Sequence, residues 1–260
     1  MFSKYNLKVG LAVFVALIAV TITAYAAHSW GSYHWARTSN PFTLKLGNNV
    51  ASAWGAYLST TSSDWSVSNV LNTTIVTGGI DPRKCRATSG RVEVCSAKYG
   101  FNGWLGIAQI WITGSHITKA TTKLNDSYFN TSTYNKPGWK NLVMCQEIGH
   151  DLGLDHQDIV DSNTNLGTCM DYTDDPDGTI KNQLSNEHPN AHDYEQLEAI
   201  YAHLNDSVTT VGQTTTGPGN HNDASEWGKS IREDGNSRTS HYERDLGNGD
   251  KVFTFVIWAE

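Results

Sequence analysis

The order of apolar and polar residues along the chain predicts several short strands. The first and the last of these segments alternate between apolar and polar residues, two are short runs bounded by glycines, and one is a longer apolar run. The strand-like segments are 41–46, 72–79, 90–96, 103–114 and 116–126.

Three further segments are expected to be helices, and the first and the last of them carry apolar residues at helical spacing. Before the first, Asn48 or Asn49 is placed to cap a helix. The second contains the sequence MCQEIGHDLGLDH, and the last covers about residues 191–204. The expected apolar face of the first helix consists of Val50, Trp54, Tyr57 and Leu58.

The first 27 residues resemble a secretory signal. Lys4 and Lys8 precede an uncharged run, Val9–Ala27, that ends in an A-x-A pattern typical of signal cleavage. Because the run is about long enough to span a bilayer, an uncleaved anchor is the alternative. In both cases the basic start predicts that the rest of the chain lies outside the cytoplasm, secreted or on the outer face of the membrane.

The C-terminal part of the chain has a different composition. Residues 207–225 are rich in Thr, Gly, Asn and Pro, which is typical of a linker after a main domain at 28–206. Residues 226–260 end in two strand-like runs joined through Gly247-Asn248-Gly249, which predicts a β-hairpin extension. Since a lone hairpin is marginally stable, we expect it to dock on the main domain.

Composition and charge narrow the class of protein. The net charge is −7 and no basic patch with interleaved aromatic residues occurs, which argues against nucleic acid as a partner. The four cysteines of an exported chain predict two disulfides, with three possible pairings, of which Cys85–Cys95 would close a short loop. No C-x-x-C pair occurs, so a structural zinc tetrad is not expected.

The segment MCQEIGHDLGLDH has the spacing of a metal-binding helix. Gln146 and His150 are four residues apart and would project from the same helix face. Glu147 could take a proton from a water molecule, which is the general-base role in metal-assisted hydrolysis. Gly153 would let the chain leave the helix through a left-handed turn, so that His156 could return as a third ligand and leave a fourth position open.

This pattern resembles the zinc motif of the metzincin metallopeptidases, H-E-x-x-H-x-x-G-x-x-H, at every fixed position except the first, which is Gln146. Downstream, the sequence GTCMDY resembles the Met-turn of that family, with Met170 as its methionine. Tyr172 lies where some members carry a tyrosine that can approach the zinc. The resemblance covers about residues 28–206 and is nearest to the matrixin-like branch.

The resemblance implies an α+β fold of the zincin type, with a twisted mixed sheet, an active-site helix, a Met-turn and a C-terminal helix. It places the segment 103–112 at the sheet edge along which peptide substrates lie. It also implies a Cys145–Cys169 disulfide, because the Met-turn of that fold runs beneath the zinc helix. The implied activity is that of a secreted endopeptidase with Zn²⁺ as cofactor, protein or peptide as substrate, and Glu147 as general base.

The departure at Gln146 leaves two alternatives open. An amide oxygen is a poorer zinc ligand than imidazole, so the chain could be a non-catalytic exported binding module with weak or no zinc binding. In a variant of the enzyme hypothesis, another histidine replaces Gln146, the candidates being His116, His188 and His192.

An acidic loop offers a second candidate ion site. Asp171, Asp174, Asp175 and Asp177 lie in the sequence DYTDDPDG, and such a run could hold Ca²⁺ through carboxylate oxygens. The loop lacks the full spacing of an EF-hand, which favours an ordinary solvated turn.

Overall fold

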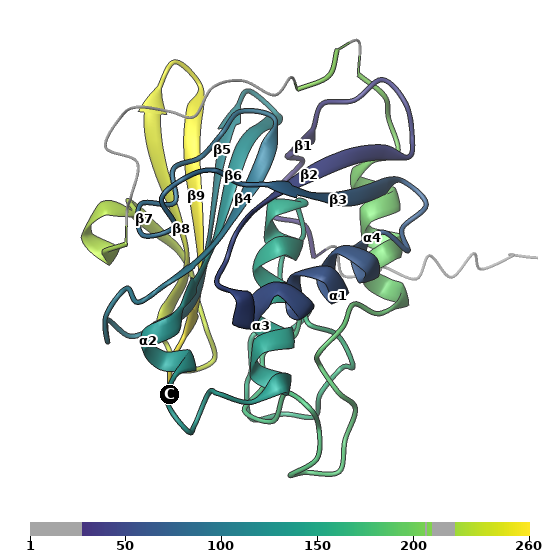
Figure 1. The fold of residues 1–260 in the computed structure, drawn as a ribbon. Coiled ribbons are helices and arrows are strands. Elements are labelled where there is room, and N and C mark those ends of the chain that lie inside the picture. The colour runs from purple at the N-terminus through teal and green to yellow at the C-terminus, as the bar shows by residue number, and fades with distance from the viewer. Residues whose placement is uncertain (1–27, 206, 210–221) are drawn as a thin grey trace, which may run out of the picture.

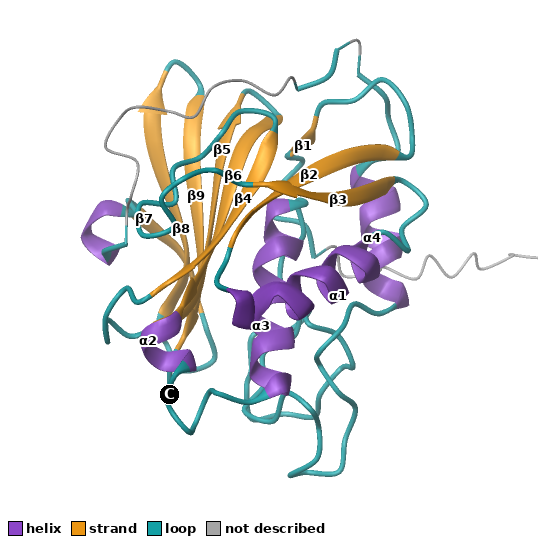
Figure 2. Ribbon diagram, in the orientation of Figure 1, coloured by secondary structure: helices purple, strands orange, loops and turns teal. Residues whose placement is uncertain are grey.

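A single mixed β-sheet organises the protein. The computed structural model describes residues 28–205, 207–209 and 222–260, and nine strands of that part of the chain form one sheet (Figures 1 and 2). The strand direction turns strongly from β3 to β9, as expected from the twist of β-strands. The predicted fold class, α+β with a twisted mixed sheet, is confirmed.

The first half of the sheet contains all the strands predicted in the main domain. Its order is β3-β2-β4-β6-β5; the first four of these strands are parallel, and β5 is antiparallel to β6. The short β1 pairs with β6 and was not predicted. The bounds are β1 His34–Trp35, β2 Phe42–Asn49, β3 Leu71–Thr77, β4 Arg91–Ala97, β5 Trp104–Thr113 and β6 His116–Asn125.

The C-terminal part of the chain continues the same sheet. The predicted hairpin consists of β8, Thr239–Gly247, and β9, Asp250–Trp258, and β7, Lys229–Glu233, adds a third strand that was not predicted. Strand β9 pairs antiparallel with β5, so the expected docking is confirmed. The apolar strand β9 therefore lies between β5 and β8 and is not an exposed edge (Figure 1).

The helices lie beside the sheet, with α1 and α3 packed together. The predicted caps Asn48 and Asn49 are wrong, because both residues belong to β2, where they pair with Val94 and Cys95 of β4. Pairing within the sheet thus overrides the local capping preference, and α1 begins without a side-chain cap. The helical elements are η1 Ser52–Trp54, α1 Gly55–Trp65, α2 Asp126–Phe129, α3 Pro137–Asp151, α4 Ala191–Ile200 and η2 Ala224–Glu226.

Helix α4 is shorter than the predicted 191–204. It starts in a capping box formed by Asn190 and Asp193. At its other end the carbonyl of Tyr201 accepts hydrogen bonds from Arg37 Nη2 (2.6 Å) and Asn40 Nδ2 (2.9 Å). These side chains supply the hydrogen bonds that the Tyr201 carbonyl would otherwise accept from the next turn of the helix.

Apolar side chains fill both faces of the sheet near β5. The main core lies between the sheet and helices α1, α3 and α4. A smaller cluster on the opposite face joins Trp104 and Ile107 of β5 to Val256 of β9 and to Trp227. Lys123 is fully buried on this second face, where Nζ donates to Gln109 Oε1 (2.8 Å) and to Asn222 Oδ1 (3.0 Å).

Burial of Lys123 makes the stability of the protein depend on pH. It lowers the pKa of Lys123 to about 7, so between pH 7 and the ordinary lysine pKa the unfolded chain binds a proton that the folded chain does not. This group therefore makes the wild type more stable as pH rises through that window. We expect the free energy of unfolding of Lys123→Met, relative to wild type, to fall by about 2 kcal/mol between pH 7 and 9.

Urea denaturation at pH 6, 7, 8 and 9 measures this difference. Lys45→Met, at an exposed position, is the matched control and should show no comparable trend. The expectation would be contradicted if the free energies of unfolding of Lys123→Met and wild type differed by the same amount at every pH.

The predicted signal or anchor, residues 1–27, lies outside the described residues. In the part of the chain that the structure describes, no helix has the length and apolar character needed to cross a membrane.

Candidate active site

Helix α3 carries the motif and ends where the sequence predicts. Gly153 has a φ of +104°, its N–H donates to His150 O (3.0 Å), and the Leu154 N–H donates to Gly149 O (3.2 Å). This pair of bonds is a Schellman motif. A Cβ at residue 153 would lie 2.9 Å from Tyr33 O, so both the conformation and the space require glycine.

Side chains from other elements anchor the end of α3. The last carbonyls of a helix have no partner within the helix and need donors from elsewhere. Three buried side chains supply them: Trp30 Nε1 donates to His150 O (3.1 Å), Trp35 Nε1 to Asp151 O (2.8 Å) and Tyr201 Oη to Leu152 O (2.9 Å).

The turn brings His150 and His156 together, with their Nε2 atoms 3.0 Å apart. His150 Nδ1 lies 2.9 Å from Leu154 O, and because a carbonyl only accepts, Nδ1 carries the hydrogen and Nε2 keeps its lone pair. Burial, with a further contribution from His156, lowers the pKa of His150 well below its usual value, so the ring is neutral. Two ligands of a tetrahedral zinc ion lie about 3.3 Å apart, so the spacing of the two nitrogens fits zinc.

The side-chain amide of Gln146 is oriented by the backbone on either side of Met170. Its Nε2 donates to Cys169 O (2.7 Å) and lies 3.5 Å from Asp171 O. Gln146 Oε1 is buried and has no hydrogen-bond partner within the described residues. A buried acceptor without a partner is costly, so this oxygen is available to a cation.

The turn that contains Met170 packs directly against α3. Met170 is fully buried, and a Cβ added at Gly149 would overlap its Sδ. A disulfide joins Cys145 of α3 to Cys169 in the turn. The second disulfide, Cys85–Cys95, ties the segment before β4 to that strand.

Glu147 is fully buried between α3 and β5. A Cβ at Gly106 of β5 would lie 2.6 Å from Glu147 Oε1, so this close approach needs glycine. Burial, and then the nearby Asp151, raise the pKa of Glu147 well above its usual value. Neither carboxylate oxygen has a hydrogen bond of normal geometry within the described residues.

Tyr172 contacts both the histidine pair and the C-terminal strand. Its ring centroid lies 4.5 Å from that of His156. Its hydroxyl donates to the backbone carbonyl of Val256 in β9 (3.2 Å). Tyr172 thus donates to a backbone carbonyl of the strand that pairs with β5.

An ion pair beside His156 was not predicted from the sequence. Arg232 of β7 holds Asp155 through Nη1–Oδ1 (2.6 Å) and Nη2–Oδ2 (2.5 Å), and the backbone N–H of His156 donates to Asp155 Oδ1 (2.8 Å). Burial alone would raise the pKa of Asp155, but His156 and then Arg232 outweigh it and hold the pKa below its usual range. The local sequence contains no signal for a partner 77 residues away.

Strand β9 covers the histidines. The Phe255 ring stacks on His150, with centroids 4.1 Å apart and planes at 12°, and on its other side it stacks on His241 (4.0 Å, 21°). His241 is buried, its pKa is lowered to about 3 mainly by burial, and neither ring nitrogen has a hydrogen-bond partner in the described chain. The apolar pattern of 252–258 predicted docking, but nothing in it indicated the place.

The three histidines considered as replacements for Gln146 have other partners. His116 Nε2 contacts Asn205, His188 pairs with Asp64, and His192 stacks on His28. Within residues 28–205, 207–209 and 222–260, no three His, Cys, Asp or Glu side chains converge as a metal site. The candidate donors are therefore the nitrogens of His150 and His156 and the amide oxygen of Gln146.

The acidic loop is a set of turns and not a convergent site. Asp174 pairs with Lys181, and Asp177 accepts from Thr179. Asp171 and Asp175 are buried and not solvated as expected, and each accepts a hydrogen bond from the backbone of the same region, from Leu166 and Lys181 respectively. These contacts give the carboxylates structural roles within the loop.

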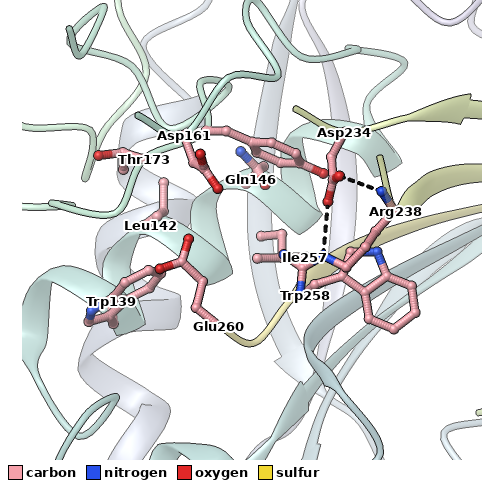
Figure 3. Close-up of a pocket in the computed structure, with 11 residues that line it drawn as sticks. Trp139, Leu142, Gln146, Asp161, Thr173, Asp234, Arg238, Ile257, Trp258 and Glu260 are labelled. Carbon is pink, nitrogen blue, oxygen red and sulfur yellow. Dashed lines mark hydrogen bonds and ion pairs between the residues drawn. The ribbon is translucent and has the colours of Figure 1, made fainter. Parts of the chain in front are cut away.

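A pocket remains between α3 and the C-terminal strands (Figure 3). Helix α3 contributes Trp139, Leu142 and Gln146 to its wall, and β9 contributes Ile257. On the far side Asp234 and Arg238 form an ion pair. The pocket therefore begins at the candidate ligand Gln146 and runs toward the start of α3.

No protein-family model matches the chain, and no curated protein matches it by sequence. Among solved structures it is similar to high choriolytic enzyme 1, a hatching enzyme zinc-protease from the medaka fish Oryzias latipes. The identity is 12% over 66% of this chain and 96% of that chain, and the TM-score is 0.37. It is also similar to myroilysin, at 13% identity over 67% of this chain and 98% of that chain, with a TM-score of 0.39. These values do not assign the chain to a family.

Proposed function

We propose that this protein is an exported zinc-dependent endopeptidase. The observation that carries the proposal is the pair of buried histidines, His150 and His156, whose Nε2 atoms lie 3.0 Å apart beside Glu147. The lone pair on His150 Nε2 and the unpartnered Gln146 Oε1 complete a donor set that suits a divalent cation.

Each side chain has a role in hydrolysis. Zinc, when bound, would polarise the carbonyl of the scissile bond and make a water molecule more acidic. Glu147 would accept the proton from that water and pass it to the leaving amine. Tyr172 would donate its hydroxyl hydrogen to the oxygen on which negative charge develops, since it already donates to a backbone carbonyl at this place.

Zinc content tests the proposal. The protein would be produced in an oxidising compartment, purified without chelators or immobilised metal, and analysed for zinc. We expect about one zinc per chain, falling to near zero in a folded His150→Ala/His156→Ala variant. Folded wild type that takes up no zinc at micromolar supply would overturn the proposal.

A second candidate is a non-catalytic exported binding module. The observation that favours it is that β9 fills the space in front of the histidines, with Phe255 stacked on His150. This candidate predicts little zinc in the purified protein and no chelator-sensitive cleavage of any peptide in a broad library. Elemental analysis followed by a peptide-library screen distinguishes the two.

Gln146→His should strengthen zinc binding. Imidazole is a better zinc ligand than an amide oxygen, so we expect an increase in zinc affinity of about 10- to 100-fold, measured by competition with a chelating dye. Gln146→Leu is the control: it removes the oxygen donor at similar volume and should weaken zinc binding. Equal affinity of Gln146→His, Gln146→Leu and wild type would show that residue 146 is not a ligand.

A further inference from the structure

Strand β9 lies along β5 in the position that an extended peptide would take. The two strands are antiparallel, with register pairs from Trp104–Trp258 at one end to Thr113–Asp250 at the other. Without the C-terminal segment, the strands β3-β2-β4-β6-β5 would form a mixed sheet with β5 at its edge. An exposed edge strand pairs readily with an extended chain.

Three consecutive residues of β9 meet the candidate active site, Phe255 and Ile257 through side chains on the inner face and Val256 through its backbone carbonyl. Phe255 stacks on His150. The carbonyl of Val256 accepts from Tyr172. Ile257 enters the pocket that Gln146 lines (Figure 3). A peptide substrate would need these same contacts: a backbone carbonyl at the tyrosine and side chains on either side of it.

This occupation closes the site. Glu147 and His150 are 0% exposed, and His156 is 6% exposed. No second chain can reach the histidines while β9 is in place. If the chain hydrolyses peptides, β9 must first leave.

Other contacts hold the C-terminal segment without involving the proposed catalytic groups. Trp227 is buried in the cluster on the opposite face of the sheet, with Trp104 and Ile107. The Gly235 N–H donates to Ile159 O (2.7 Å). Retention of β9 can therefore be changed from outside the active site.

We propose that β9 occupies a groove between β5 and α3 that binds an extended peptide, and that β9 thereby keeps the proposed peptidase closed. The chemistry of β9 names the class of ligand: an extended segment, antiparallel to β5, with bulky apolar side chains at alternate positions, as Phe253, Phe255 and Ile257 are here. The inference rests on the proposed function only for its catalytic consequence, because occupation of the groove can be tested by binding alone.

Two variants of the full chain change the retention of β9 in opposite directions. Thr113→Cys/Asp250→Cys would join β5 to β9 by a disulfide at the end of their register, away from the site, at the Cα separation of paired strands. Trp227→Ala would remove the anchor on the opposite face. The probe is a fluorescein-labelled peptide of the sequence GDKVFTFVIWAE, residues 249–260 of this chain.

We expect the peptide to bind Trp227→Ala at least tenfold more tightly than wild type. It should bind the oxidised cysteine variant at least tenfold more weakly than the same variant after mild reduction. Wild type under the same reduction is the control for the native disulfides, whose cysteines are fully buried. If Trp227→Ala does not fold, the oxidised and reduced cysteine variant decides the question alone.

Equal binding to all forms, or binding to none of them, would overturn the inference, because the groove would then not exchange β9 for a peptide. Cleavage of a peptide library by the same forms separates this result from failure of the proposed function. If the chain is not a peptidase, no form cleaves, yet the order of binding is retained. If only the inference is wrong, any cleavage is unaffected by the disulfide.

Discussion

Glu147→Gln is expected to reduce peptide cleavage by about 10³-fold while the zinc content stays near that of wild type. Glutamine has nearly the same shape but cannot accept the proton from the attacking water. Zinc should be retained because Glu147 is the proposed base and not a ligand. The rate is measured on a form whose groove is open to peptides, with Glu195→Gln, exposed on α4, as the matched control.

Stability provides a second readout of the same variant. Glu147 is fully buried without a hydrogen bond of normal geometry in the described chain, and burial raises its pKa well above the usual value. Replacing a buried carboxyl group of this kind with a neutral amide should not lower the melting temperature in the absence of zinc. Cleavage at the wild-type rate by Glu147→Gln, or loss of zinc with loss of fold, would contradict the proposed role.

Removing the Cys145–Cys169 disulfide is expected to lower both stability and zinc affinity. The cysteines are 24 residues apart, and a loop of this size corresponds to a loss of about 3 kcal/mol in the free energy of unfolding for Cys145→Ala/Cys169→Ala. Because the carbonyl of Cys169 holds the Gln146 amide, we also expect zinc affinity to fall at least tenfold.

The other disulfide is the matched control for this effect. Cys85→Ala/Cys95→Ala should also destabilise the protein, since it opens a loop with a separation of 10 residues. Its zinc affinity should stay at the wild-type level, because neither cysteine contacts the motif. Denaturant unfolding measures the loss of stability, and a zinc competition titration measures the loss of zinc affinity. An equal loss of zinc affinity in both variants would mean that the disulfide beneath α3 does not position the ligands.

The sequence predicted the strands and the motif helix well because each depends on a local pattern. Alternation and glycine boundaries located β2 to β6, and the left-handed conformation of Gly153 follows from its place after a helix. Local rules failed where distant partners compete with them. Asn48 and Asn49 pair with β4 and do not cap α1. Arg37 and Asn40 donate hydrogen bonds to the Tyr201 carbonyl, where α4 ends earlier than predicted.

By itself the sequence determined the strands, the helix that carries Gln146, Glu147 and His150, and the turn that can return His156, because helical period and a glycine turn are local properties. Only the tertiary structure decided what surrounds them. The free edge of β5 is taken by β9, whose Phe255 stacks on His150 although the two residues are 105 positions apart in the sequence. Apolar burial has no preferred direction, so the pattern of β9 predicts that it is buried but not against which surface.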